Sequence, residues 1–228
     1  MNILIIGATS GIGHELWRHY AVQGNRVAVM GRRKAELDVM ARTAPDHTVA
    51  SVCDIADTGS FDVAFDHIVG ELGTLDLVIV CAGIGELNPE LNIVTELTTV
   101  GVNVTGWTNC IDRVYRQFSE QGRGHLVTVT SVGGLQPTPV APSYSASKAY
   151  QINYTKSLQA KSKGTGIFVT EIRPGLVNTR MAKGEGLFWV MPLDKVTRAI
   201  IRAIDRKRTR LIVTRRWRLL NYLLKHFM

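Results

Sequence analysis

The beginning of the chain restricts its fold more than any other feature. An apolar run at residues 2–6, rich in isoleucine and leucine, is typical of a strand that is buried on both faces. Three glycines follow at positions 7, 11 and 13, and the next segment places Leu16 and Tyr20 on one face of a helix. A strand, a glycine-rich turn and a helix in this order predict the phosphate-binding unit of an α/β fold.

Each part of this turn can take a physical role in binding a pyrophosphate. A glycine at position 7 permits a tight turn, and glycines at positions 11 and 13 let the backbone and the helix approach the ligand closely. Neighbouring hydroxyl groups can donate further hydrogen bonds. The spacing G-x-x-x-G-x-G alone also fits an ordinary glycine-rich turn between a strand and a helix. The expected contacts in the turn are Gly7, Thr9, Ser10, Gly11, Ile12 and Gly13.

The rest of the chain alternates short apolar runs with helical stretches. No linker, repeat or low-complexity tract interrupts the pattern, and 228 residues suit one domain. We therefore predict an α/β protein, a single-domain Rossmann-like doubly wound parallel sheet of about seven strands with helices on both faces, over residues 1–228. Strands are expected near residues 2–6, 25–30, 47–52, 75–80, 124–130, 166–172 and 209–213, and helices near 12–23, 33–43, 58–71, 91–120, 143–163, 193–206 and 215–226.

A second group of residues carries the chemistry. Tyr144 and Lys148 are four residues apart, so on a helix they lie one turn apart on the same face. An ammonium beside a phenol lowers the pKa of the tyrosine, which makes the phenol a usable general acid or base. Ser131, thirteen residues before Tyr144, can donate a second hydrogen bond to the same substrate oxygen. The alternative is an ordinary helix start with an exposed lysine.

The two motifs together resemble the short-chain dehydrogenase/reductase family, and the resemblance extends from Asn2 to about Thr179. It implies interconversion of a carbonyl and an alcohol by hydride transfer with a nicotinamide cofactor. In this chemistry Tyr144 is the general acid or base, and Lys148 also binds the nicotinamide ribose. The asparagine of the family motif kinks a helix and holds a water of the proton relay. The implied catalytic tetrad is Asn103, Ser131, Tyr144 and Lys148.

The resemblance also implies cofactor contacts outside the glycine turn. Val80 and Cys81 stand where the family usually has two asparagines, so the side-chain contacts of those asparagines are missing. Members of the family usually pair through long helices, here those near 91–120 and 143–163, so a homodimer or homotetramer is expected. The implied contacts are Asp54 and Ile55 at the adenine, Ala82 and Gly83 where the backbone passes the cofactor, Pro174, Val177 and Thr179 at the nicotinamide end, and Tyr144 and Lys148.

The end of the predicted second strand indicates which nicotinamide cofactor binds. NAD sites of this fold place a carboxylate there for the ribose 2′-hydroxyl, but this chain has Gly31 followed by Arg32 and Arg33. A guanidinium can bind a 2′-phosphate with two parallel hydrogen bonds. We therefore predict NADP(H), with Arg32 as the principal contact and Arg33 as the secondary one. The alternative is a solvated basic cluster at a helix start, a placement that the helix dipole disfavours.

A catalytic metal is not expected. The six histidines are scattered, and no cluster of His, Cys, Asp or Glu has the spacing of ligands. The cysteines at positions 53, 81 and 110 form no disulfide framework and lie in apolar stretches, which predicts buried reduced thiols and a cytoplasmic protein. No apolar run has the length of a signal peptide or a membrane span.

Positive charge is concentrated at the C-terminus. Eleven of the 27 Lys and Arg residues lie from Lys195 onward, where Asp205 is the only acidic residue. The predicted basic amphipathic helix at 215–228 either packs on the domain or across a subunit interface, which we favour, or lies on a membrane surface. No recognised nucleic-acid module accompanies the charge, so no nucleic-acid partner is expected. Two rival functions follow, a dinucleotide sensor without catalysis and a peripheral membrane protein that acts through this tail.

The substrate is expected to be a small-molecule carbonyl compound or alcohol. The loop from Arg180 to Met191 stands where the family covers its substrate, and it contains Phe188 and Trp189. An apolar cover favours an apolar or aromatic substrate. The alternative is that these two aromatic residues fill the core, and the shortness of the loop favours an open or small site.

Overall fold

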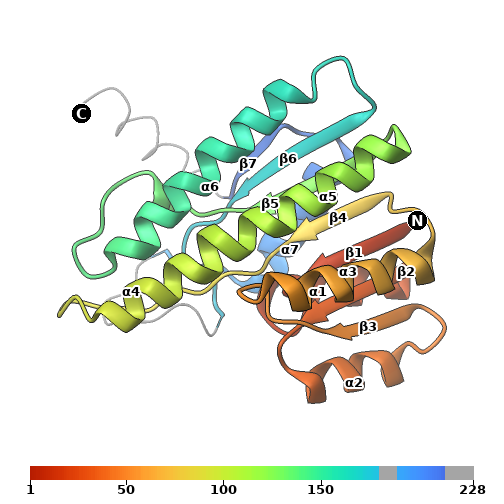
Figure 1. Cartoon of the computed structure of the whole chain (residues 1–228), viewed down its shortest axis with the longest axis horizontal. Coiled ribbons are helices and arrows are strands. Elements are labelled where there is room, and N and C mark those ends of the chain that lie inside the picture. The colour runs from red at the N-terminus through yellow and green to blue at the C-terminus, as the bar shows by residue number, and fades with distance from the viewer. Residues whose placement is uncertain (180–188, 214–228) are drawn as a thin grey trace.

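A parallel sheet of seven strands forms the centre of the protein in the computed structural model, which describes residues 1–179 and 189–213 (Figure 1). The strand order is β3-β2-β1-β4-β5-β6-β7, so the direction in which strands are added reverses at β1. This confirms the predicted doubly wound parallel sheet. The strands are β1 (Asn2–Ile6), β2 (Arg26–Gly31), β3 (Thr48–Val52), β4 (Leu77–Val80), β5 (Gly124–Val129), β6 (Ile167–Arg173) and β7 (Arg210–Ile212).

Helices cover both faces of the sheet (Figure 1). One apolar cluster joins the sheet to α1, α2 and α7, and the other joins it to α3, α5 and α6. The helices are α1 (Gly11–Val22), α2 (Lys34–Thr43), α3 (Thr58–Leu72), α4 (Ile93–Val100), α5 (Trp107–Gln121), α6 (Pro142–Lys161) and α7 (Leu193–Asp205).

Strand β1 shows why a continuous apolar run becomes a central strand. It pairs with β2 on one side and β4 on the other. Leu4 and Ile6 belong to the cluster under α3 and α5, whereas Ile3 and Ile5 belong to the cluster under α1 and α7. All four side chains are at most 1% exposed. Each contributes about 1.5–3 kcal/mol to stability by leaving water.

The parallel arrangement gathers the predicted site at one edge of the sheet. The glycine turn follows β1, Arg32 follows β2, Asp54 follows β3, Cys81 follows β4 and Ser131 follows β5. Because all strands run in the same direction, these segments emerge from the same edge. In open α/β sheets, ligands bind at this edge near the point where the strand order reverses.

The long helix expected near residues 91–120 is divided into three parts. A π-helical segment, Gly101–Gly106, joins α4 to α5 and contains Asn103. The side chain of Asn103 bonds the loop after β4, and a Cβ at Gly106 would lie 2.1 Å from the carbonyl oxygen of Ile55. The kink expected at Asn103 is therefore a π-helical segment that packs against two loops of the site edge. Such segments occur frequently at functional sites.

Two predicted segments fall wholly or partly outside the described residues. The basic helix at 215–228 lies outside them, and the loop Arg180–Met191 is described only from Trp189 onward. Among the residues that the structure does describe, no helix combines the length and the apolar character that crossing a bilayer requires.

His125 is a buried histidine at the edge of the sheet opposite the site. It lies in β5 and is 8% exposed. Its Nε2 lies 2.8 Å from the Thr170 hydroxyl oxygen, and its ring packs edge-to-face on Phe168. Burial, with a smaller effect of the Lys207 ammonium, lowers the pKa of His125 from 6.5 to about 4. The imidazole is therefore neutral in the folded protein at neutral pH.

We expect the free energy of unfolding to fall as the pH drops from 6.5 towards 4. In this range the unfolded chain binds a proton at His125 that the folded protein does not bind, so acid favours unfolding. At about pH 5 the loss is on the order of 2 kcal/mol. Urea unfolding at about pH 7.5 and about pH 5 measures it for the wild type, His125→Gln and the exposed-site control His67→Gln. His125→Gln should lose less stability on acidification than the other two proteins. Equal losses in all three would contradict the assignment.

Candidate functional site

The glycine turn after β1 lies directly against the loop after β4. Gly7 has φ +87°, and a Cβ there would lie 2.6 Å from the backbone nitrogen of Ala82. A Cβ at Gly13 would lie 2.4 Å from the carbonyl oxygen of Gly7, so α1 starts in contact with the turn. Ser10 precedes α1 without using its side chain as a cap. The turn and the start of α1 therefore form a cradle whose N–H groups suit a phosphate.

The segment after β6 closes over this turn. A Cβ at Gly11 would meet the methyl group of Thr179 at 3.3 Å, so the two predicted cofactor contacts are neighbours. The carbonyl oxygen of Pro174 accepts a hydrogen bond of 3.0 Å from the backbone N–H of Val132, the residue after Ser131. The structure thus connects the segment after β6 both to the glycine turn and to the predicted catalytic serine.

Three predicted cofactor contacts have side chains that pack on the core. Ile12 and Val177 contact the cluster under α1 and α7, and Ile55 belongs to the cluster under α3 and α5. Ile55 and Val177 are each 6% exposed. These side chains hold the loops in place by packing on the core.

The two arginines at the end of β2 lie differently. The Arg33 guanidinium folds over the glycine turn, where Nε and Nη2 lie 3.0 and 2.7 Å from the Thr9 hydroxyl oxygen. The Arg32 guanidinium is 57% exposed and lies 3.5 Å from a carboxylate oxygen of Asp54. A Cβ at Gly31 would lie 2.9 Å from the Thr9 methyl group, so a larger side chain there displaces Thr9. The end of β2 therefore offers two guanidinium groups where NAD sites place a carboxylate.

The loop after β4 lies between the glycine turn and α6. A Cβ at Gly83 would come within 3.3 Å of both Asn103 Oδ1 and Lys148 Nζ. Burial raises the pKa of the Cys81 thiol to about 12, although the Lys148 ammonium acts in the opposite direction. The thiol therefore stays protonated at neutral pH.

The three cysteines are free thiols, as the sequence predicts. Cys53 and Cys110 are buried, but Cys81 is only partly buried. The difference arises because Cys81 belongs to the loop that borders the site, whereas the other two lie in the cluster under α3 and α5.

Helix α6 brings the catalytic candidates together. The Lys148 ammonium lies 5.9 Å from the centroid of the Tyr144 ring. The ring lies close to two glycines, since a Cβ at Gly85 would meet it at 3.0 Å and one at Gly133 at 3.2 Å. Ser131 Oγ lies beside the ring, since the same Cβ at Gly133 would come within 3.3 Å of it. The predicted acid/base residue, its lysine and its serine thus form one cluster.

The pKa of Tyr144 differs in direction from the sequence-based expectation. Burial raises it above its ordinary value, and the hydrogen bond from Ser131 only partly opposes this. Burial also lowers the pKa of Lys148 to about 8. The expected lowering of the tyrosine pKa is therefore wrong for the protein alone. Burial of the phenolate raises the pKa by more than the neighbouring groups lower it.

Asn103 uses its side chain to hold two elements together. Its Nδ2 donates to the Ile84 carbonyl oxygen at 2.8 Å and to the Ser147 hydroxyl at 3.1 Å, and its Oδ1 accepts from the Ile84 N–H at 2.9 Å. These bonds join the loop after β4 to α6. All four members of the predicted tetrad are therefore close to this loop or to each other.

Sequence reasoning missed Gln151, which is 0% exposed. Its Oε1 accepts from Lys148 Nζ at 2.9 Å, and its Nε2 donates to the carbonyl oxygen of Asn103 at 2.8 Å. The relay water expected at Asn103 stays a prediction, and the carbonyl oxygen of Asn103 accepts a hydrogen bond from this side chain. The signal was present in the sequence, because a polar residue three positions after Lys148 lies on the same face of the helix.

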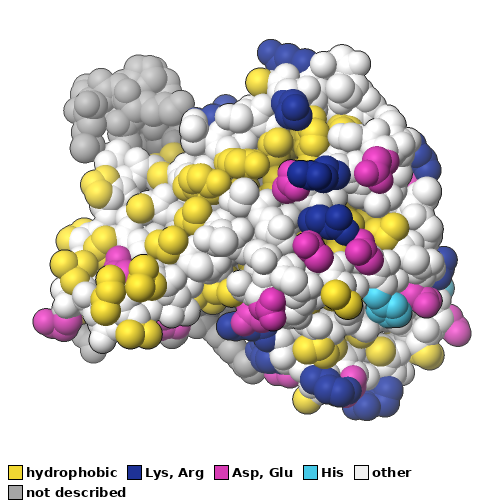
Figure 2. Space-filling model, in the orientation of Figure 1, with side chains coloured by type: hydrophobic (Ala, Val, Ile, Leu, Met, Phe, Trp, Pro, Cys, Tyr) yellow, Lys and Arg dark blue, Asp and Glu magenta, His cyan; other side chains and the backbone are white. Residues whose placement is uncertain are grey.

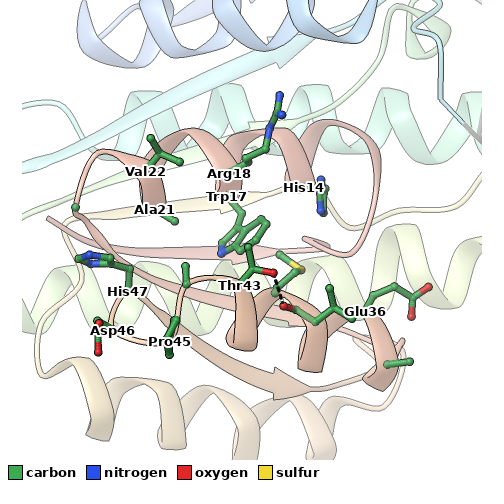
Figure 3. A pocket seen from close by; sticks show the side chains of 15 residues that line it. His14, Trp17, Arg18, Ala21, Val22, Glu36, Thr43, Pro45, Asp46 and His47 are labelled. Atoms are coloured by element: carbon green, nitrogen blue, oxygen red, sulfur yellow. Dashed lines mark hydrogen bonds between the residues drawn. The ribbon is translucent and has the colours of Figure 1, made fainter.

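A hollow in the surface lies away from these residues. It is an open groove of about 830 Å³ between α1 and α2, and Figure 3 shows Trp17 pointing into it. The indole N–H of Trp17 already donates to the Thr48 hydroxyl at 2.9 Å. The groove includes none of the predicted site residues. Within residues 1–179 and 189–213, no group of His, Cys, Asp and Glu side chains is placed to hold a metal ion.

Comparison with known proteins gives consistent results. The family model described as short chain dehydrogenase matches residues 1–187. An uncharacterised oxidoreductase of Mycobacterium tuberculosis is 32% identical over 220 residues, which cover 90% of this chain and 85% of the relative.

Two solved structures share the fold and hold different cofactors. The 3-ketoacyl-(acyl-carrier-protein) reductase of Brucella melitensis, complexed with NADH, superimposes with a TM-score of 0.84 at 24% identity, covering 93% of this chain and 96% of that chain. The closed form of a serine dehydrogenase complexed with NADP⁺ superimposes with a TM-score of 0.81 at 23% identity, covering 89% of this chain and 88% of that chain. Fold similarity therefore leaves both nicotinamide dinucleotides open, and the choice between them rests on residues of this chain.

Proposed function

The chain belongs to the short-chain dehydrogenase/reductase family as an oxidoreductase, and we propose that it interconverts a small-molecule carbonyl compound and its alcohol with NADP(H). The observation that supports this most directly is the cluster of Tyr144, Ser131 and Lys148 beside the glycine cradle. The turn suits a dinucleotide, because Gly7 and Gly13, where a Cβ would clash with the backbone of Ala82 and of Gly7, let the turn, the loop after β4 and the start of α1 pack closely together. When bound, the nicotinamide supplies or accepts the hydride.

Tyr144 is the proposed general acid for carbonyl reduction. Its raised pKa keeps the phenol protonated at neutral pH, so it can donate a proton to the substrate oxygen. Ser131 is proposed to hold the same oxygen, because its Oγ and the Tyr144 ring both lie next to Gly133. Lys148 is proposed to bind the nicotinamide ribose and to stabilise the phenolate that remains after proton transfer. Asn103 fixes the loop and the helix that carry these groups.

NADP(H) is the proposed cofactor because of Arg32 and Arg33. We keep Arg32 as the principal contact with a 2′-phosphate, because its pair with Asp54 is long and exposed and can open easily. Arg33 already bonds Thr9 beside the turn, and we keep it as the proposed secondary contact. The free thiols suit the reducing cytoplasm that we propose as the location.

A homodimer or homotetramer is the proposed assembly. Figure 2 shows hydrophobic side chains gathered over α4, where Ile93, Val94 and Leu97 are 64%, 68% and 62% exposed. A run of large apolar side chains on one surface helix marks an interaction surface more often than a solvated one. The neighbouring α6 contributes exposed Tyr150 to the same side of the molecule.

Replacing Tyr144 by phenylalanine should reduce carbonyl reduction by about 10²–10⁴-fold. The change removes only the hydroxyl, so folding and NADPH binding should survive. NADPH oxidation with a panel of ketones, aldehydes and quinones measures the effect. Tyr150→Phe on the same helix, whose hydroxyl bonds Thr108 at the surface, is the matched control. Near wild-type turnover by Tyr144→Phe would contradict the proposed role of Tyr144 as general acid.

Replacing Arg32 by aspartate, together with Arg33→Ala, should exchange attraction for repulsion at a 2′-phosphate. Losing hydrogen bonds to a charged group should raise the KM for NADPH by about 10–100-fold, while the KM for NADH should stay equal or fall. The two single variants, Arg32→Ala and Arg33→Ala, rank the contributions of the two residues. Arg42→Asp on the exposed side of α2 introduces the same charge reversal as Arg32→Asp away from the end of β2 and is its control. A wild type that prefers NADH would refute the cofactor assignment.

Replacing Leu97 by glutamate should weaken the oligomer, because it places a charge in an apolar contact. Sedimentation velocity should show a shift towards the monomer without a lower melting temperature of the fold. Val63→Glu, at an exposed apolar position on α3, is the control and should not change the assembly. If wild type and Leu97→Glu have the same oligomeric state, α4 is not the interface.

A further inference from the structure

The Lys148 ammonium has a fixed partner inside the protein. Gln151 Oε1 lies 2.9 Å from Lys148 Nζ, while the carbonyl oxygen of Val129 is farther away at 3.5 Å. The lysine and the glutamine are 5% and 0% exposed. At this burial a hydrogen bond to the ammonium is strong, and its loss is costly, because water does not replace the missing partner.

The chemistry of the two neighbours determines which side chain can stand at position 151. An ammonium only donates hydrogen bonds and a carbonyl oxygen only accepts them. The amide of Gln151 meets both demands at once, with its oxygen on Lys148 and its nitrogen on Asn103. A carboxylate satisfies only the lysine, and an apolar side chain of the same length satisfies neither.

The π-helical segment supplies the second anchor. Its altered backbone register presents the carbonyl oxygen of Asn103 towards α6, where Gln151 reaches it at 2.8 Å. The side chain of Asn103 is engaged separately with Ile84 and Ser147. Asn103 therefore makes two separate sets of contacts. Its side chain bonds Ile84 and Ser147, and its carbonyl oxygen bonds Gln151.

We propose that Gln151 is a positioning residue of the active site, which fixes Lys148 against the π-helical segment through its bonds to Lys148 Nζ and to the carbonyl oxygen of Asn103. This inference rests on the proposed function for its catalytic meaning. An amide neither gains nor loses a proton near neutral pH. The link through Gln151 to Asn103 therefore orients the ammonium and does not conduct the proton that Tyr144 exchanges.

The charged and titratable groups around Lys148 are few among the described residues. The Cys81 thiol faces it from the loop after β4, and the Tyr144 phenol faces it from α6. On α4, Glu96 bonds the backbone N–H of Ser143 at the start of α6. On β6, Glu171 and Arg173 are paired with each other at 2.6 and 2.8 Å. A substitution at position 151 therefore changes one contact of Lys148 and leaves these other charged and titratable groups in place.

The first test measures Lys148 directly and needs no substrate. The ¹³C shift of Lys148 Cε, assigned with Lys148→Arg, is followed against pH in the wild type, Gln151→Glu, Gln151→Met and Gln159→Met. A carboxylate beside the ammonium should raise the titration midpoint by about one to three pH units. The methionine variant should titrate below the wild type, because the ammonium loses its acceptor. Gln159 lies on the same helix and bonds the Thr209 carbonyl oxygen at 2.6 Å, so its variant is the matched control and should titrate as the wild type does.

The second test is the pH profile of kcat/KM for NADPH-dependent carbonyl reduction. Gln151→Met should lower kcat/KM by about 10–100-fold, and Gln151→Glu should shift the alkaline limb upward. Gln159→Met should alter only stability. If the wild type turns over but all variants share its profile and its lysine titration, the role of Gln151 is wrong and the proposed function stands. If the lysine titration shifts as expected but the wild type turns over no carbonyl compound, the positioning of Lys148 stands and the proposed function fails.

Discussion

The loop after β4 is in contact with both halves of the site, and the geometry of the site depends on it. On one side, the backbone of Gly7 approaches Ala82 so closely that a Cβ would lie 2.6 Å from its nitrogen. On the other side, Asn103 makes two hydrogen bonds to the backbone of Ile84. The glycine turn and α6 are thereby connected across a short stretch of backbone. A catalytic arrangement needs this kind of support, because small displacements of reacting groups cost large factors in rate.

Burial governs the electrostatics of the site. It raises the pKa of the Tyr144 phenol and lowers that of the Lys148 ammonium, so each group is pushed towards its neutral form. Ser131 acts on the phenol and Gln151 acts on the ammonium, so each titratable group has a neutral partner of its own. In a low-dielectric environment a hydrogen bond to such a neutral partner is strong, and burying a neutral partner costs less free energy than burying a second charge.

The fold and the grouping of site residues were open to prediction, while the contacts between them were not. Short apolar runs, glycines in turns and helical periodicity can be recognised from neighbouring residues alone. The strands therefore lie close to their expected positions. The division of the helix near 91–120 depends on Asn103 and Gly106, whose partners lie far away in the sequence. Sequence patterns carry no information on burial depth at a particular atom, which is why the direction of the Tyr144 pKa was misjudged.

By itself, the sequence determined the parallel α/β architecture, the glycine cradle at the start of α1 and the Tyr144–Lys148 pair, because each rests on spacing along one element. Only the tertiary structure decided that Arg33 bonds Thr9 while Arg32 pairs with Asp54, and that Gln151 links Lys148 to Asn103. The physical reason is that a side chain chooses its hydrogen-bond partner among all the groups within its reach. In a folded chain most of those groups come from other elements, and packing alone brings them close.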